Sequence, residues 1–229
     1  MGPTVILIPA YNEADRIRDT IGAVKDAAGI DEVVVVDDGS EDDTASAASE
    51  CGARVIRLQS NCGKGAALNK ALAEVDAEIY LLVDADLGSS AAETLKLLEP
   101  VQSGQADMSI ASITVPPGHK AGFGLVKGLA RWGIKRFGGG EMSAPISGQR
   151  AIRGEVIRDI GELGEGYGVE VALTIDALRM GYKVVEVPLD ITHRFTGRNL
   201  SGFIHRGRQF KDVLRAILRR RKHRPDPAR

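Results

Sequence analysis

Residues 33–40 read Val-Val-Val-Val-Asp-Asp-Gly-Ser, and residues 79–86 read Ile-Tyr-Leu-Leu-Val-Asp-Ala-Asp. Each stretch is an apolar run that ends in a pair of acids. Such runs are typical of strands that are buried on both faces of a sheet. In open α/β sheets, ligands bind just beyond the carboxyl ends of the strands. Both acidic pairs therefore fall where a ligand is expected.

The first hundred residues alternate between strand-like and helix-like segments. Strands are expected at Thr4–Pro9, Glu32–Val36, Arg54–Leu58 and Glu78–Val83, and a later one at Met108–Ile113. Helices are expected at Glu13–Ala28, Asp42–Glu50, Lys64–Val75 and Ala91–Gln102. Helices between strands imply parallel pairing through right-handed crossovers. The predicted fold class is therefore α/β, with a Rossmann-like, mostly parallel sheet flanked by helices.

Beyond residue 113, glycine and proline become frequent. One strand is expected at Val184–Val187, and helices are expected at Phe123–Phe137, Ile152–Ile160, Val169–Met180 and Gly202–Arg221. The last helix has one apolar stripe bordered by basic residues, and the stripe consists of Phe210, Val213, Leu214, Ile217 and Leu218. An amphipathic C-terminal helix of this kind either packs on the domain or lies on an anionic membrane surface.

The chain has 229 residues and a net charge of −1, but its charge is uneven. Residues 198–229 contain eleven Lys and Arg against two acids, which suggests an anionic ligand or surface near the C-terminus. Phe203 and Phe210 are the only aromatic residues there, which argues against nucleic-acid binding. Two cysteines indicate reduced thiols. No apolar run approaches the ~20 residues that cross a bilayer. The expected location is the cytoplasm or, for a peripheral protein, the inner face of the cell membrane.

Asp84-Ala85-Asp86 is the sharpest chemical signal in the sequence. Alternation along a strand places Asp84 and Asp86 on one side of the chain. Two such carboxylates repel each other unless a cation or a proton intervenes. Carboxylates are also the ligands of hard cations, so Mg²⁺ or Mn²⁺ is expected here. The alternative is that these acids cap the following helix.

Three further motifs follow strands or precede helices. After the first strand comes Pro9-Ala10-Tyr11-Asn12-Glu13, where backbone N–H groups and the Asn amide can hold a ligand. In Asp37-Asp38-Gly39 an acid can accept hydrogen bonds from a ribose or a base, or it can cap the next helix. Lys64, between two glycines at a helix start, either steadies a diphosphate or is simply solvated.

Taken in order, Pro-Ala-Tyr-Asn-Glu, Val-Val-Asp-Asp-Gly-Ser, Gly-Lys-Gly and Asp-Ala-Asp resemble the nucleotide-sugar half of a family-2 glycosyltransferase with the GT-A fold. The resemblance covers nearly the whole chain. It implies one domain over residues 1–200, in which 1–113 serve the nucleotide-sugar and 114–200 the acceptor. A basic amphipathic helix and tail would follow at 201–229.

The resemblance also implies roles for the motif residues. Asp37 or Asp38 would hold the base or ribose, Asp84 would lie near the ribose or the metal, and Asp86 would bind the metal that bridges the diphosphate. The donor site would then comprise Pro9, Ala10, Tyr11, Asn12, Glu13, Asp37, Asp38, Gly39, Lys64, Asp84, Ala85 and Asp86.

The second half is similar to two subgroups. Residues 145–150 and 186–189, followed by Arg194 and residues 197–199, resemble polyprenyl-phosphate sugar transferases of the dolichyl-phosphate mannose synthase group. Residues 166–170 and the pair His193-Arg194 resemble glucosyl-3-phosphoglycerate synthases, in which the histidine is a metal ligand. His193 would then join Asp84 and Asp86 at the metal. The alternative for His193 is an ordinary hydrogen-bonded histidine.

The expected activity is transfer of a sugar from a UDP- or GDP-sugar to a phosphate-bearing acceptor. Polyprenyl phosphate at a membrane surface is favoured over a small acceptor such as 3-phosphoglycerate. The catalytic set is expected to be Asp86 on the metal, Arg150 and Arg194 on the acceptor phosphate, and Glu170 as orienting group or base. Arg150 is alternatively a surface arginine. A nucleotide-sugar-binding module without turnover is the alternative of another class, and homodimer formation is left open.

Overall fold

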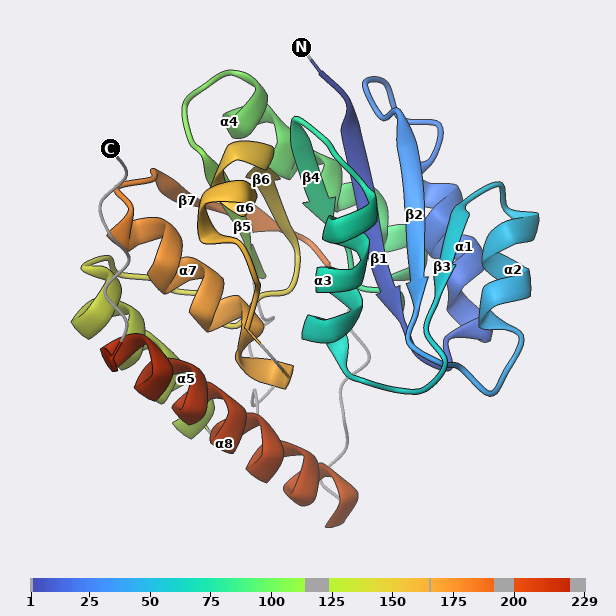
Figure 1. The fold of residues 1–229 in the computed structure, drawn as a ribbon. Helices are drawn as coiled ribbons and strands as arrows, with labels where there is room; N and C mark the ends of the chain where they lie inside the picture. Colours follow the sequence, from blue (N-terminus) through green and yellow to red (C-terminus); the bar gives the residue numbers. More distant parts are fainter. Residues whose placement is uncertain (1, 114–123, 165, 192–199, 223–229) are drawn as a thin grey trace.

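The computed structural model describes residues 2–113, 124–164, 166–191 and 200–222. Within these residues one sheet has the strand order β3-β2-β1-β4-β6-β5-β7. The strands are β1 (Thr4–Ala10), β2 (Glu32–Asp37), β3 (Arg54–Arg57), β4 (Ile79–Leu82), β5 (Met108–Ile113), β6 (Arg150–Arg153) and β7 (Val184–Leu189). Most strand pairs are parallel and helices flank the sheet (Figure 1), so the expected α/β class is confirmed.

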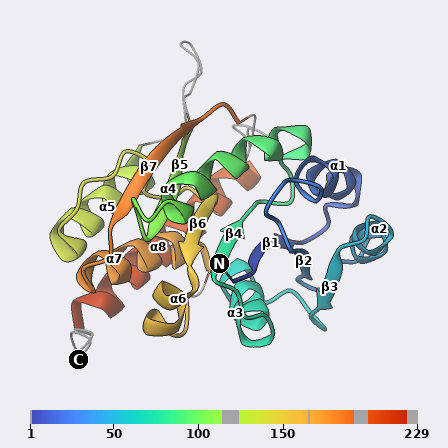
Figure 2. The same cartoon turned by 90° about the horizontal axis from the view of Figure 1, so that it is seen from above.

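Two helical layers cover the sheet, and a third layer lies outside one of them (Figure 2). One face packs against α1 (Ala14–Val24), α2 (Thr44–Glu50) and a 3₁₀ segment (Gly88–Leu97) that leads into α4 (Leu98–Gln102). The other face packs against α3 (Lys64–Glu74), α6 (Gly154–Ile160) and α7 (Val169–Arg179). Outside α7 lie α5 (Leu125–Gly133), a π-helical turn (Ile134–Gly138) and α8 (Leu200–Lys222).

Strand β6 is the main departure from the sequence expectation. A helix was expected from Ile152, but Arg150–Arg153 form a strand and α6 begins only at Gly154. This strand lies antiparallel between β4 and β5. Its apolar core is Ala151-Ile152, which is too short a run for periodicity to separate strand from helix. Because β6 lies next to β4, the residues that precede Arg150 come beside the carboxyl end of β4.

The register of the parallel strands aligns the motif residues at one edge of the sheet. Pro9 and Ala10 of β1 lie opposite Val36 and Asp37 of β2.

Gly39, just beyond β2, has a φ of +72°, and a Cβ there would lie 2.5 Å from the backbone carbon of Ser60. A larger residue at this position would therefore push the β2–α2 turn away from the loop that leads to α3.

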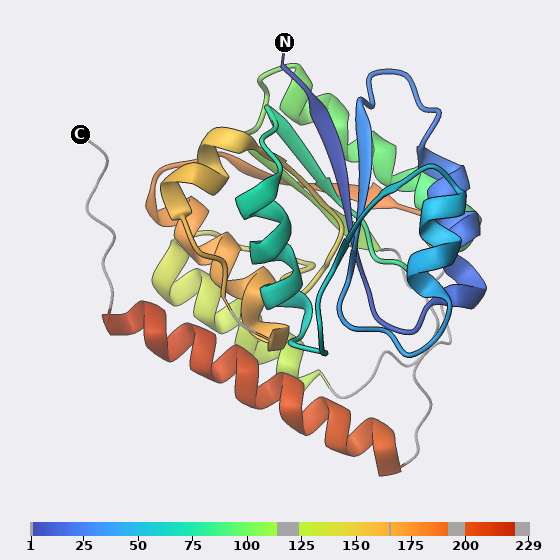
Figure 3. The same cartoon turned by 45° about the vertical axis from the view of Figure 1, so that its right-hand side comes forward.

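Helix α8 runs along one end of the molecule beside α5 (Figure 3). Val213 and Ile217 are fully buried against α5 and α7. A Cβ on Gly133 of α5 would overlap Ile217, so the two helices approach closely. Phe210 and Leu218 of the same stripe remain 39% and 47% exposed. The stripe is thus used in packing on the domain, and a role of its exposed part at a membrane stays a prediction.

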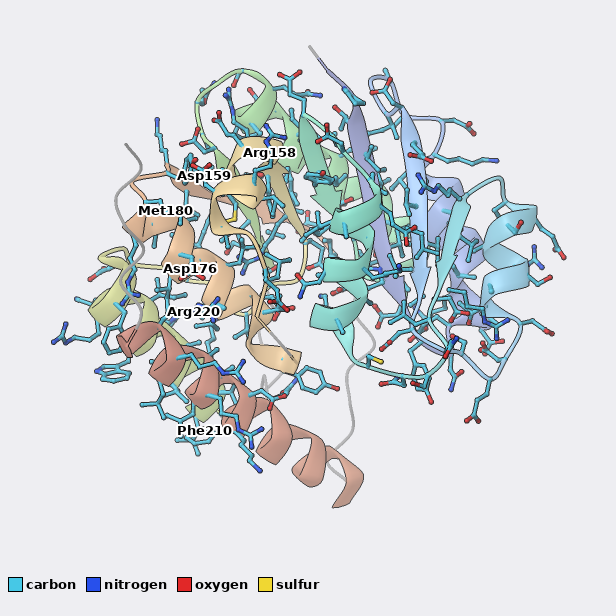
Figure 4. The ribbon with its side chains drawn as sticks, viewed as in Figure 1. Arg158, Asp159, Asp176, Met180, Phe210 and Arg220 are labelled. Atoms are coloured by element: carbon cyan, nitrogen blue, oxygen red, sulfur yellow. The ribbon has the colours of Figure 1, made fainter. Side chains whose placement is uncertain are left out.

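Asp176 of α7 and Arg220 of α8 face each other across the helix pair (Figure 4). Arg220 Nε donates to the Asp176 carboxylate at 2.8 Å and Nη2 lies 2.6 Å from the same oxygen, with both side chains largely buried. Arg179 donates to the carbonyl oxygens of Phe137 and Arg220, each at 2.6 Å. These contacts fasten the end of α8 to the rest of the molecule.

Replacing Arg220 with methionine is expected to lower the free energy of unfolding by about 2–4 kcal/mol, because Asp176 would keep a buried charge without its partner. Urea denaturation measures this change. The matched control is Arg158→Met, since Arg158 pairs with Asp76 in a solvent-exposed geometry and is expected to contribute under about 1 kcal/mol. Equal effects of the two substitutions would contradict the assigned role of Arg220.

Candidate active site

Two adjoining pockets lie at the carboxyl ends of β1, β2 and β4. The first, of about 460 Å³, is lined by Asp84 and Asp86, and the second, of about 470 Å³, is lined by Asp38. Four residues belong to the walls of both pockets: Pro9, Tyr11, Lys64 and Tyr167. The acidic residues that follow β2 and β4 therefore line neighbouring parts of one site. The volumes are those of ordinary ligand pockets.

The two acids after β2 have different surroundings. Asp37 is fully buried, accepts a hydrogen bond from the Ser40 N–H at 2.9 Å and lies 3.1 Å from Arg57 Nε. Asp38 accepts the N–H groups of Cys62 and Gly63 at 2.8 and 2.7 Å, and it also lines the second pocket. Asp37 thus holds the turn after β2, whereas Asp38 fixes the loop before α3 and faces the ligand space.

Asn12 ties the β1–α1 turn to the β2–α2 loop. It has a φ of +55°, which is uncommon for a residue other than glycine. Its N–H donates to Ser40 Oγ at 3.0 Å, and its side-chain oxygen accepts the Glu41 N–H at 2.9 Å. The Asn12 amide oxygen is therefore engaged within the protein. The neighbouring Tyr11 is 42% exposed and lines both pockets.

Lys64 stands at the centre of a charged network. Its ammonium lies 2.7 Å from Asp84 Oδ1 and 3.1 Å from Glu170 Oε1. The other oxygen of Asp84 accepts a hydrogen bond from the Gln149 side chain. These four side chains come from α3, the loop after β4, α7 and the segment before β6, so the network joins both halves of the chain. Glu170 lines the first pocket, and its role toward the acceptor stays a prediction.

Gly148 allows this network to close. A Cβ at this position would lie 2.5 Å from Lys64 Nζ and 2.8 and 2.9 Å from the two carboxylate oxygens of Asp84. Only a hydrogen atom fits there. Burial by itself would lower the pKa of Lys64, but the attraction of Asp84 and Glu170 outweighs it and raises that pKa above its ordinary value. Lys64 is consequently charged at neutral pH.

Arg150 lies beneath the site and is fully buried. Its Nε donates to the Ser147 carbonyl at 2.9 Å and its Nη1 donates to Thr174 Oγ1 at 2.8 Å. Burial lowers the pKa of Arg150 to about 10, against the opposing attraction of Glu170 and Glu186. It lines neither of the two pockets, and its role as an anchor of the acceptor phosphate stays a prediction. The alternative of a surface arginine is wrong, because Arg150 is fully buried and holds the turn that carries Gly148 and Gln149.

Asp84 and Asp86 together fit a hard divalent cation. Both carboxylates line the first pocket, and Mg²⁺ or Mn²⁺ is commonly held by one or two carboxylates together with substrate phosphates. Across the described parts of the chain, no three His, Cys, Asp or Glu side chains form a metal-binding cluster. His193 and Arg194, the other residues expected at the metal and the acceptor, fall outside the described residues.

Helix α8 supplies site residues that the sequence did not reveal. Gln209 and Val213 line the first pocket, and Asp212 lines the second. Asp212 also accepts the Tyr167 N–H at 3.3 Å. At Gly166 and Gly168 a Cβ would come within 2.5 Å and 2.7 Å of Asp212 and Ala216. The glycine-rich sequence 164–168 was therefore the available signal: it marks where another element packs closely, but it cannot say which one.

Comparison with known proteins identifies the family of this chain. The family profile described as Glycosyl transferase family 2 matches residues 5–161. Polyprenol monophosphomannose synthase of Mycolicibacterium smegmatis is 34% identical over 91% of this chain and 84% of its own length. Glycosyltransferase AglJ of Haloferax volcanii is 30% identical over 80% of this chain, which spans only 61% of that protein.

A solved structure of glucosyl-3-phosphoglycerate synthase from Mycobacterium tuberculosis, in complex with Mn²⁺, UDP and phosphoglyceric acid, superposes with a TM-score of 0.81. The two chains are 26% identical, and the match covers 96% of this chain and 78% of the synthase. The expected fold and the expected resemblance are thus both confirmed. The chain belongs to glycosyl transferase family 2.

Proposed function

We propose that this protein transfers a sugar from a nucleoside diphosphate sugar to a phosphate-bearing acceptor, with Mn²⁺ or Mg²⁺ as cofactor and polyprenyl phosphate as the favoured acceptor. The observation that carries the proposal is the shared wall between the Asp38 pocket and the Asp84–Asp86 pocket. A nucleoside fits the pocket that Asp38 lines, and a cation-bound diphosphate fits the pocket that Asp84 and Asp86 line. The synthase from Mycobacterium tuberculosis, solved in complex with Mn²⁺ and UDP, supports a nucleotide donor and a divalent cation for this protein.

Four charged residues of the first pocket have a task in the proposed reaction. Asp84 and Asp86 would hold the cation, which neutralises charge on the leaving diphosphate when bound. Lys64 supplies a fixed positive charge in the wall between the pockets, where the charge on the diphosphate grows. Glu170 orients the acceptor. Because an acceptor phosphate is already a nucleophile, no strong base is required of Glu170.

The far wall of the first pocket favours a lipid acceptor. Its apolar lining residues are Val126 of α5, Val213 of α8, and Ile146, which lies in the segment before β6. Lys64 is the one cation among the described lining residues, and Asp84 and Glu170 already bind it. An isoprenoid chain requires apolar surface of the kind that these three side chains provide.

A matrix of donors and acceptors tests the proposal. The full chain with Mn²⁺ is incubated with UDP- or GDP-sugars and with either undecaprenyl phosphate in detergent or 3-phosphoglycerate, and products are identified by mass spectrometry. Product with the lipid phosphate is the expected result. If product formed with 3-phosphoglycerate only, the acceptor would be 3-phosphoglycerate and not the lipid phosphate. If the donor bound but no product formed, the protein would be a nucleotide-sugar-binding module without turnover.

We further propose that the exposed face of α5 and α8 rests on an anionic membrane. No helix in the described ranges is long and apolar enough to cross a membrane. Four large apolar side chains are nonetheless exposed on these two packed helices: Leu125, Trp132, Phe210 and Leu218. Exposed arginines lie on the same helices, namely Arg131, Arg215 and Arg219, and Arg136 is exposed on the π-helical turn that follows α5. Apolar and cationic side chains together are what a peripheral membrane surface requires.

Replacing both Trp132 and Leu218 with serine is expected to reduce binding to vesicles containing anionic lipid at least tenfold, because each inserted side chain contributes about 1.5–3 kcal/mol. Cosedimentation measures the loss, and activity on a water-soluble short-chain prenyl phosphate is expected to persist. Arg158→Ser, on the exposed side of α6, is the matched control. Undiminished vesicle binding by the double variant would remove the membrane proposal. Deletion of α8 is unsuitable, since Val213 and Ile217 belong to the core.

A further inference from the structure

The ammonium group of Lys64 lies where two functions of the site meet. It contacts Asp84, on the cation and donor side, and Glu170, on the acceptor side. It also belongs to the walls of both pockets. Gly148 closes over it so tightly that a single added carbon would lie 2.5 Å from Nζ. In the donor-free enzyme the ammonium group is therefore held by its two carboxylates, beside the main chain of Gly148.

The charges of the site require a cation at this point. Asp84, Asp86 and Glu170 all line the first pocket, and Lys64 is the one cation that the described lining contributes. Carboxylates gathered in a partly buried space repel one another unless a positive charge intervenes. A divalent cation bound at Asp84 and Asp86 would supply such a charge from outside the protein. The negative charge of Asp84 can thus be balanced either by Lys64 or by the divalent cation.

We propose that Lys64 is a resident cation, which holds Asp84 and Glu170 in the donor-free enzyme and turns to the diphosphate when the donor and its metal ion bind. The inference rests on the proposed function of the same site. Lys64 lies at the boundary of the two pockets, so its flexible four-carbon stem can redirect the charge without movement of α3. Release of Glu170 then couples donor binding to acceptor binding.

The first experiment uses Mn²⁺ alone, followed by electron paramagnetic resonance. Lys64→Met removes the resident charge and is expected to raise the affinity for Mn²⁺ at least about fivefold, because an electrostatic competitor within a few ångströms is gone. Lys64→Arg keeps the charge and is expected to bind Mn²⁺ as the wild type does. Thermal unfolding confirms that each variant is folded. An unchanged or weaker affinity of folded Lys64→Met would overturn the proposal.

The second experiment measures UDP and GDP binding in the presence of Mn²⁺ by calorimetry. Glu170→Gln loosens the hold on Lys64, so the nucleoside diphosphate is expected to bind several-fold more tightly than to the wild type. In the Lys64→Met background the same substitution is expected to have no effect, since the lysine that it would free is absent. Additive effects of the two substitutions would contradict the coupling. Glu162→Gln, at an exposed position, is the control.

The two experiments separate this inference from the proposed function. If the wild type binds neither UDP nor GDP and forms no product, the proposed function fails. The comparison of Lys64→Met with Lys64→Arg in Mn²⁺ alone still decides whether Lys64 is a resident cation. If product forms but Glu170→Gln leaves the affinity for UDP and GDP unchanged, the proposed function is retained and the proposed coupling through Lys64 is wrong.

Discussion

Replacement of Asp86 with asparagine is expected to lower the rate of glycosyl transfer at least about a thousandfold, which corresponds to about 4 kcal/mol of lost transition-state stabilisation. Asp86 lines the first pocket, and its main-chain carbonyl, not its side chain, accepts the hydrogen bond from Arg16 at 3.1 Å. The carboxylate therefore faces ligand space, and its removal leaves the fold intact. Initial rates at saturating donor and Mn²⁺ measure the loss.

The control for this substitution is Asp76→Asn. Asp76 is an exposed carboxylate in the segment between α3 and β4, and it pairs only weakly with Arg158 at 3.4 Å. Its replacement is expected to leave both activity and melting temperature within error of the wild type. If Asp86→Asn kept more than a tenth of the activity with normal Mn²⁺ affinity, Asp86 would not hold the cation.

Replacement of Gly148 with alanine is the second change with a large expected effect. The new Cβ would lie 2.5 Å from Lys64 Nζ and under 3 Å from both oxygens of Asp84. Either the lysine or the carboxylate must shift, and displacement of catalytic groups by about 1 Å lowers rates by about a hundredfold. We expect kcat/KM to fall by that factor or more, as measured with the same donor and acceptor as the wild type.

Gly22→Ala is the matched control for a glycine substitution. Gly22 lies on the exposed side of α1, and a Cβ there meets no atom within 4 Å. Alanine in the middle of a helix is expected to increase stability by about 0.5–1 kcal/mol and to leave activity unchanged. Wild-type activity in Gly148→Ala would show that the close approach of residues 148, 64 and 84 has no part in catalysis.

The first half of the chain could be predicted well, and the reason is physical. Buried parallel strands require continuous apolar runs, and an acid that ends such a run needs a specific partner or a ligand, so both signals coincide at Val36-Asp37 and Val83-Asp84. The predicted strand and helix order through residue 113 agrees with the structure, although residues 88–97 form a 3₁₀ helix. Local patterns suffice where each element is buried by its sequence neighbours.

The second half depends on contacts between distant residues. Arg150 carries the same charge whether it lies on the surface or holds a buried turn, and only the position of β6 decides between them. Similarly, the apolar stripe on α8 predicts that this helix buries one face. It does not predict that α8 lines the pockets, because that depends on the close packing of α8 against Gly166 and Gly168. The division at residues 113 and 200 and the formation of a homodimer stay predictions.

The central claim is that acids following β2 and β4 line one site, in which Asp84 and Asp86 hold a cation against the diphosphate and Asp38 lies beside the nucleoside. Crystals grown with UDP and Mn²⁺, measured at a wavelength with anomalous scattering from manganese, test it most directly. The account predicts one manganese peak between the Asp86 carboxylate and the diphosphate, with the uracil in the pocket that Asp38 lines. A manganese peak remote from Asp84 and Asp86, or UDP bound outside both pockets, would contradict it.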